Sequence, residues 1–178
     1  ISSGQNEKKI FGILEKVKPV RGRMELAATK KNGATVYVDY AHTPDAIEVA
    51  LKSLKPHILG KLIVIIGAGG ERDEGKRPLM GKAAEKNSDF VIITDDNPRK
   101  EDPSLIHQMI KNGIQDNGKV MVIADRAEAI LKAVDLLDTG DGLLIAGKGH
   151  ETEQFIGENI FPFDDFEQAS LSVASLDG

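Results

Sequence analysis

Short apolar runs alternate with amphipathic stretches along most of the chain. The run from Lys61 to Ile66 is almost continuously apolar, which is typical of a strand buried on both faces of a parallel sheet. Strands that alternate with helices imply a parallel sheet with right-handed crossovers and helices on both faces. The sequence therefore predicts an α/β fold.

Periodicity and turn signals place the individual elements. Helices are predicted at 5–17, 44–54, 77–86, 104–111, 126–137 and 165–173. Strands are predicted at 24–30, 35–39, 61–66, 90–94, 120–124 and 143–146, with a small hairpin at 155–161 around Gly157. Asn32-Gly33 between the first two strands is a hairpin signal. Proline and glycine at 19 and 22 break the first helix, so we place a boundary near residue 18.

Composition excludes several classes of protein. The net charge of -5 argues against a sequence-independent grip on nucleic acid, which depends on a basic surface. The absence of cysteine excludes a disulfide scaffold, thiolate metal sites and cysteine nucleophiles. No apolar run approaches the ~20 residues that cross a bilayer, and the polar residues 1–9 do not resemble a signal peptide. Because the first residue is not methionine, we expect the chain to be part of a longer protein.

Four polar clusters each follow directly on a predicted strand. Any one of them is explained equally well as a tight turn, because glycine, proline and asparagine favour turns. The carboxyl ends of parallel strands share one edge of the sheet, however, and open α/β sheets bind ligands beyond that edge. We therefore expect the four clusters to converge on a functional crevice. They occupy residues 39–44, 67–78, 95–99 and 147–151.

The charged residues of these clusters suit a zwitterion. The planar forks of Arg72 and Arg99 are adapted to a carboxylate, and Asp96 and Glu151 to an ammonium group. The alternative is that these charges pair with one another. His42 and His150 are candidate acids, bases or hydrogen-bond donors. No spacing of histidines and carboxylates indicates a metal site.

The segment from Gly70 to Arg77 reads G-x-x-x-x-G-K-R, one residue away from a phosphate loop. A phosphate loop needs Ser or Thr after the lysine to hold magnesium, and Arg77 stands there instead. The glycines still allow backbone amides to approach an anion, with Arg72, Lys76 and Arg77 supplying positive charge. The G-x-G-x-x-G fingerprint is absent, so a nucleotide-dependent dehydrogenase is the least favoured interpretation.

Together these residues carry a family resemblance. The chain resembles the C-terminal domain of the Mur ligases, in the form that adds meso-diaminopimelate as the third residue of the peptidoglycan stem peptide. The resemblance runs from about residue 18 to the end, and five motifs occur in the family's order. They are Gly22 to Glu25, Asp39 to Pro44, Gly69 to Pro78, Asp96 to Arg99, and Gly147 to Glu151.

The resemblance implies a Rossmann-like, mostly parallel sheet flanked by helices. It implies that residues 1–18 are the tail of a central ATP-binding domain, and that 19–178 are the C-terminal amino-acid-binding domain. The family forms an amide bond through an acyl phosphate, in the cytoplasm. ATP, Mg²⁺ and the UDP-N-acetylmuramoyl dipeptide would bind through domains that this chain lacks. We therefore expect no catalytic residue, metal ligand or tightly bound cofactor in this chain, and no activity of the chain alone.

The resemblance also assigns site residues. Asp96, Asn97, Pro98 and Arg99 match the family's diaminopimelate motif, while Arg72, Gly147 and Glu151 match its other amino-acid contacts. Three further residues match positions that face the nucleotide, namely Arg23, Asp39 and His42.

Arg99 favours diaminopimelate over lysine, because only diaminopimelate has a second carboxylate that needs a cation. Two alternatives remain. One is a related amide ligase that adds lysine or glutamate. The other is a non-catalytic α/β binding module that keeps the fold for protein contacts.

Overall fold

The computed structural model describes residues 20–178, so the helix predicted at 5–17 and the boundary near residue 18 lie outside the described residues. Every other predicted element is present. The strands are β1 (Glu25–Thr29), β2 (Thr35–Asp39), β3 (Leu62–Ile66), β4 (Phe90–Ile93), β5 (Val120–Val122), β6 (Gly142–Ala146), β7 (Glu153–Ile156) and β8 (Asn159–Pro162). The helices are α2 (Pro44–Leu54), α3 (Lys76–Asn87), α4 (Pro103–Lys111), α5 (Arg126–Asp135) and α6 (Asp165–Asp177), with 3₁₀ turns at Lys55–His57 and Asn117–Lys119.

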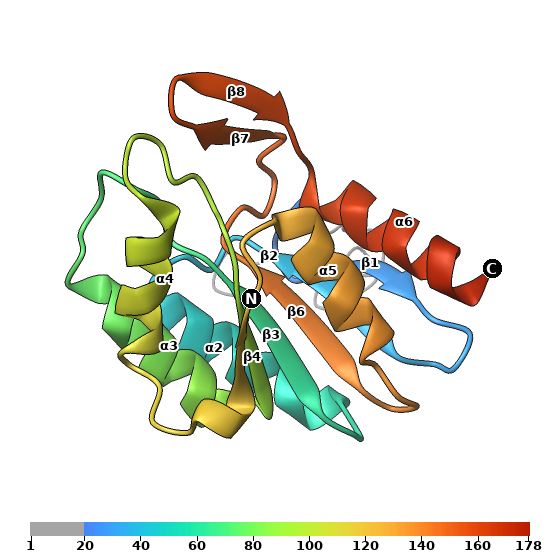
Figure 1. Cartoon of the computed structure of the whole chain (residues 1–178). Coiled ribbons are helices and arrows are strands. Elements are labelled where there is room, and N and C mark those ends of the chain that lie inside the picture. The colour runs from blue at the N-terminus through green and yellow to red at the C-terminus, as the bar shows by residue number, and fades with distance from the viewer. Residues whose placement is uncertain (1–19) are drawn as a thin grey trace, which may run out of the picture.

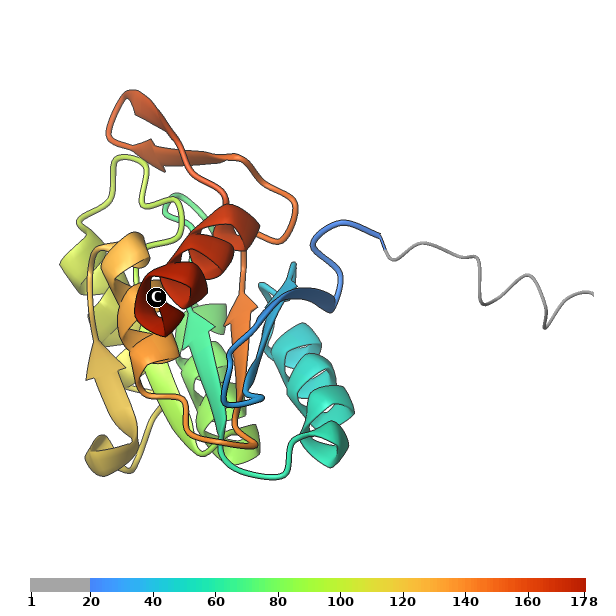
Figure 2. The ribbon, with the colours of Figure 1, turned by 90° about the vertical axis from the view of Figure 1, so that its right-hand side faces the viewer.

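Six strands form the central sheet in the order β1-β2-β6-β3-β4-β5. All neighbours pair in parallel except β1, which runs antiparallel to β2 across the predicted Asn-Gly turn. The predicted α/β class with a mostly parallel sheet is therefore confirmed. β7 and β8 form a separate antiparallel hairpin that projects from the body of the molecule (Figures 1 and 2).

Helices cover both faces of the sheet, and each face has its own core. Val64 and Ile66 of β3 pack in the same cluster as Leu51 of α2 and Met80 of α3. The residues between them face the other way, where Ile65 packs with the cluster of α5 and α6. Figure 2 shows α2 and α6 on opposite sides of the strands. This alternation explains why β3 and β6 are buried along their whole length.

The order of the strands brings the polar loops together. β2, β6, β3 and β4 are neighbours, and each is followed by one of the four polar clusters. From β3 the chain proceeds outward through β4 and β5 and then returns to place β6 on the other side of β3. Such a reversal of strand order is where open α/β sheets form their ligand crevice.

Candidate functional site

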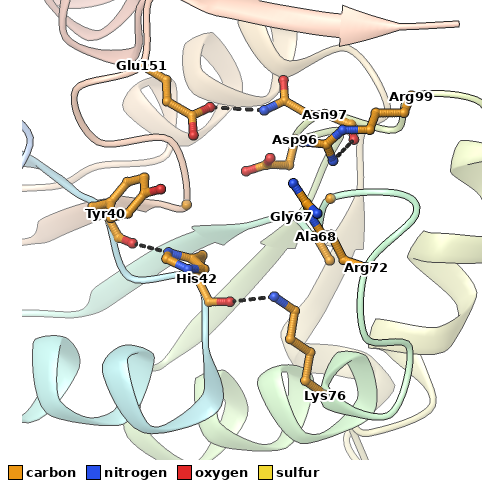
Figure 3. Close-up of a pocket in the computed structure, with 12 residues that line it drawn as sticks. Tyr40, His42, Gly67, Ala68, Arg72, Lys76, Asp96, Asn97, Arg99 and Glu151 are labelled. Carbon is orange, nitrogen blue, oxygen red and sulfur yellow. Dashed lines mark hydrogen bonds between the residues drawn. The ribbon is translucent and has the colours of Figure 1, made fainter.

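The four clusters meet in one pocket of about 260 Å³ at the carboxyl edge of the sheet (Figure 3). This confirms the convergence expected from the sequence. Six of the seven residues predicted to bind the amino acid line this pocket, and so does His42. The full lining is Tyr40, His42, Gly67, Ala68, Gly69, Arg72, Lys76, Asp96, Asn97, Arg99, Gly147 and Glu151.

Arg99 is held in the pocket wall by its neighbours. Its Nη1 donates to the carbonyl oxygen of Gly70 at 2.9 Å, which leaves other guanidinium donors for a ligand. Its backbone has a φ of 53° and is fixed by the β7–β8 hairpin. The amide of Arg99 donates to the carbonyl of Phe155 at 3.0 Å, and its own carbonyl accepts from the amide of Gly157 at 2.7 Å. The hairpin therefore sets the position of this cation.

Two glycines of the loop after β3 permit close approach to the Asp96–Arg99 loop. A side chain at Gly70 would overlap the carbonyl oxygen of Pro98, and one at Gly69 would lie 3.0 Å from Nη1 of Arg99. Pro98 itself does not line the pocket. Its place is behind the wall, where its backbone packs against Gly70.

Asp96 faces the pocket with its carboxylate uncommitted. Its exposed fraction is only 8%, yet among residues 20–178 no hydrogen bond reaches its carboxylate oxygens. A side chain at Gly147 would lie 2.6 Å from Oδ2 of Asp96, so glycine is required there. The buried charge of Arg126 acts on this carboxylate from behind, but among residues 20–178 no donor satisfies its oxygens, and such a carboxylate favours a cationic ligand group.

Glu151 and Asn97 form a second polar wall. Nδ2 of Asn97 donates to Oε2 of Glu151 at 2.9 Å (Figure 3). Lys148, which is fully buried, donates to both side chains from behind. Sequence reasoning did not single out Lys148, because a lysine between two glycines usually indicates an exposed turn.

The three residues predicted to face a nucleotide lie around Tyr40, where His42 lines the pocket and Arg23 and Asp39 lie beside it. His42 packs edge-on against the Tyr40 ring, and the guanidinium of Arg23 lies 4.9 Å from the centroid of that ring. The carboxylate of Asp39 is already hydrogen-bonded within the chain, because its two oxygens accept from the backbone amides of Met24 and Ala41 at 2.7 and 2.8 Å. Its observed contacts therefore hold the loop.

Arg77 was expected to add positive charge near an anion, and the structure corrects this. Its side chain is fully buried and pairs with Glu101, with Nη1 and Oε2 2.8 Å apart. Its Nη2 also donates to the carbonyl of Gly69 at 3.3 Å. The arginine that replaces Ser or Thr of a phosphate loop therefore anchors the glycine loop from behind and does not line the pocket.

A second buried arginine, also missed from the sequence, lies beneath the pocket. Arg126 at the start of α5 pairs with Asp165 at the start of α6, with Nε and Oδ1 2.7 Å apart. It also donates to the carbonyls of Asp95, two residues after β4, and of Ala146, the last residue of β6. Burial acts to lower the pKa of Arg126, but the charge and hydrogen bonds of Asp165 outweigh it and raise that pKa.

Two features are absent from the same part of the chain. Among residues 20–178 no group of three or more histidine, cysteine or acidic side chains is arranged to hold a metal ion. Within that range no helix is both long enough and apolar enough to cross a membrane.

Comparison with known proteins gives matches along nearly the whole chain. The family described as "Mur ligase, glutamate ligase domain" matches residues 22–149. The UDP-N-acetylmuramoyl-L-alanyl-D-glutamate–2,6-diaminopimelate ligase of Bradyrhizobium diazoefficiens is 46% identical over 98% of this chain and 35% of its own length. The ligase of the same name from Synechococcus elongatus is 52% identical over 87% of this chain and 31% of its own. The chain thus spans about a third of the length of these curated relatives.

Solved structures agree with this result. A structure of a UDP-N-acetylmuramoyl-L-alanyl-D-glutamate–2,6-diaminopimelate ligase has a TM-score of 0.84 at 38% identity, covering 99% of this chain and 36% of the other. The UDP-N-acetylmuramate-alanine ligase of Thermotoga maritima, at 18% identity, has a TM-score of 0.65 over 98% of this chain and 34% of its own. The second likeness shows only that the fold is shared.

Proposed function

The chain belongs to the Mur ligase family, and on that premise we propose that it is the amino-acid-binding domain of a ligase that joins meso-diaminopimelate to UDP-N-acetylmuramoyl-L-alanyl-D-glutamate. The observation that carries the proposal is the distribution of charge in the pocket. Arg72 and Arg99 line the same pocket as two carboxylates, with Glu151 across from the arginines and Asp96 between Glu151 and the arginines (Figure 3).

This arrangement matches the chemistry of a diamino diacid. Guanidinium groups bind carboxylates through paired, charge-assisted hydrogen bonds, and carboxylates bind ammonium groups. Diaminopimelate differs from lysine in its second carboxylate. We assign Arg99 to that carboxylate, because lysine offers no second carboxylate to pair with this half-buried cation.

The remaining assignments follow from the pocket. Arg72, Asp96, Asn97, Arg99 and Glu151 contact the amino acid, with Gly147 providing the space for Asp96 and Pro98 fixing the loop. Residues 1–18 belong to the preceding domain of the ligase, and 19–178 form its amino-acid-binding domain.

The residues around Tyr40 form one side of a nucleotide site. Arg23 and His42 are exposed beside the Tyr40 ring and offer donors and charge to a phosphate or a ribose. Asp39 supports them by holding the backbone at Met24 and Ala41. ATP, bound with Mg²⁺ mostly through the rest of the ligase, would supply activation of the acceptor carboxylate as an acyl phosphate. The part left to this chain is to bind the amino acid and orient its amine.

Calorimetric titration of this chain with meso-diaminopimelate, and in parallel with lysine, tests the proposal. We expect binding of diaminopimelate and at least about tenfold weaker binding of lysine, since one charge-assisted contact is lost. Arg99→Ala should remove that preference. Arg21→Ala is the matched control, because Arg21 pairs with Asp164 outside the pocket. Equal binding of both amino acids would contradict the substrate assignment, and no binding of either would contradict amino-acid recognition by this chain.

A further inference from the structure

We propose that Lys148 is a positioning residue for amino-acid recognition, which fixes Asn97 and Glu151 in the pocket wall without touching the ligand. The inference rests on the proposed function, because it explains how that pocket is prearranged. Lys148 lies two residues after the end of β6, has 0% of its surface exposed, and is not among the residues that line the pocket. Any effect of its ammonium group on a ligand must therefore pass through its partners.

The ammonium group of Lys148 has three acceptors for its three N–H bonds. Nζ lies 3.0 Å from Oδ1 of Asn97, 3.3 Å from Oε2 of Glu151 and 2.6 Å from the carbonyl oxygen of Glu153. A buried cation is tolerated only when it is paired and hydrogen-bonded in this way. The lysine is thus tied to the wall of the pocket from behind.

Lys148 and the backbone amide of Phe155 together fix which way the amide of Asn97 points. Oδ1 of Asn97 lies between two donors, Nζ of Lys148 and the backbone amide of Phe155, each at 3.0 Å. An ammonium group has no acceptor, so only the oxygen of the amide fits at this position. Nδ2 then faces Glu151, which has only acceptors to offer at neutral pH. Asn97 therefore presents a donor, and no acceptor, on the ligand side of the wall.

Glu151 is held by the same contacts. Its Oε2 accepts from both Asn97 and Lys148, while among residues 20–178 no hydrogen bond reaches its Oε1. That second oxygen remains for the ammonium group of a ligand. Without Lys148, the amide of Asn97 loses one of the two donors that fix its orientation, and Glu151 loses its ion-pair partner. The donor that Asn97 offers to the ligand and the carboxylate that Glu151 offers to its ammonium group would then both be less well placed, and binding would weaken.

The substitution Lys148→Met tests this, because it keeps most of the side-chain length and removes the charge and the donors. We expect the affinity for meso-diaminopimelate to fall about tenfold or more, as for the loss of one or two charge-assisted hydrogen bonds. Leu51→Ala is the control, since it opens the core beneath α2 and lowers the melting temperature without touching the pocket. An affinity of Lys148→Met equal to that of the unaltered chain would overturn the inference.

A double-mutant cycle separates positioning from a general loss of stability. Once Lys148 is replaced, Asn97→Ala should weaken binding less than it does in the unaltered chain, because the amide has already lost one of the two donors that orient it. Losses of affinity that simply add would overturn the inference.

Nuclear magnetic resonance of the unaltered chain keeps the inference testable if Lys148→Met does not fold. The Nζ protons of Lys148 should exchange slowly enough to be seen, and the side-chain amide signals of Asn97 should shift on addition of meso-diaminopimelate. Fast exchange at Lys148, or an unchanged Asn97 amide in the bound state, would overturn it. If the unaltered chain binds no amino acid, the proposed function fails, and the exchange rate at Lys148 alone decides whether the wall is prearranged.

Discussion

Three basic side chains are buried behind the pocket, and each holds a different part of it. Arg77 anchors the glycine loop, Lys148 anchors Asn97 and Glu151, and Arg126 joins the loop after β4 to the end of β6. Burying a charge is costly unless it is paired, so each of these residues depends on an acidic partner. The pocket is thus lined by charges that are available to a ligand and backed by charges that are already paired.

At the scale of the residue, the ion pair of Arg126 and Asp165 is the contact whose loss we expect to destabilise the fold most. Both side chains are fully buried, and the hydrogen bonds and charge of Asp165 hold the pKa of Arg126 above its usual value despite burial. We expect Asp165→Asn to lower the free energy of unfolding by about 3–5 kcal/mol, because an uncompensated charge remains inside. Urea unfolding followed by circular dichroism measures this.

The control for this prediction is Asp135→Asn, which breaks the exposed pair of Lys132 and Asp135. An exposed pair contributes about 0–1 kcal/mol, so this variant should unfold close to the unaltered chain. If the two variants lost equal stability, the buried pair would be no more important to the fold than an exposed one.

The carboxylate that pairs with Arg77 gives a prediction about pH. Hydrogen bonds from Arg77, with a further one from the amide of Glu71, lower the pKa of Glu101 against the opposing effect of burial. A carboxyl whose pKa is lowered by folding stabilises the fold above its unfolded value, about 4.3, and this stabilisation is lost as the pH falls through the folded value. The stability advantage of the unaltered chain over Glu101→Gln should therefore shrink on acidification from about pH 6 to about pH 3.

Unfolding by urea at several pH values measures this difference. The exposed pair of Lys100 and Glu158 supplies the control, and Glu158→Gln should show almost no such trend. A constant difference between the unaltered chain and Glu101→Gln across this range would contradict the role of the carboxylate.

At the scale of the element, the β7–β8 hairpin contributes more to the position of Arg99 in the pocket than to the stability of the fold. Its strands are largely exposed, yet its backbone pairs with Arg99. Gly157 at its turn has a φ of 61°, a conformation that a β-branched residue adopts only under strain. We expect Gly157→Val to weaken diaminopimelate binding several-fold, in line with the partial loss of one oriented contact, while the melting temperature changes little.

Gly33→Val is the matched variant for this test, because Gly33 also has positive φ but lies in the β1–β2 turn, away from the pocket. Its strain should leave binding unchanged. Weakened binding in both variants, or in neither, would show that the hairpin does not position Arg99.

The helices and strands were predictable from the sequence, but the order in which the strands pair in the sheet was not. Periodicity of 3.6 or 2 and signals such as Thr43-Pro44 or Asn32-Gly33 act over a few residues, so the helices and strands from β1 to α6 were predicted to within a few residues. The insertion of β6 between β2 and β3 depends on pairing between residues 107 and 80 positions apart, as Thr35 with Gly142 and Leu62 with Gly142, which no local pattern encodes. The buried roles of Arg77 and Arg126 were missed for the same reason, since their acidic partners lie on other elements. Lys148 has Glu151 close by in the sequence, but its contact with Asn97 joins residues 51 apart.

At the scale of the whole molecule, four loops on neighbouring strands make one site. The residues that line the pocket could therefore be predicted from the sequence, whereas the buried basic residues behind it could not. Parallel strands end at one edge, and this rule alone brought residues as distant as His42 and Glu151 together. A site assembled from four separate segments should bind its ligand only in the folded chain. Ligand binding must then stabilise the entire domain.

This gives a prediction for thermal unfolding. At a meso-diaminopimelate concentration of about 100 times Kd, binding to the folded state alone adds about 2.7 kcal/mol, which corresponds to roughly 5–10 °C in melting temperature for a domain of this size. The chain has no tryptophan, so circular dichroism is the suitable probe. Arg99→Ala should reduce the shift to about half or less at that concentration, since a tenfold weaker site gains only about 1.4 kcal/mol there, whereas Arg21→Ala should keep it because Arg21 lies outside the pocket. A shift that sodium chloride reproduces at equal ionic strength, or that Arg99→Ala leaves at full size, would come from screening of surface charge and would contradict a site built from these four loops.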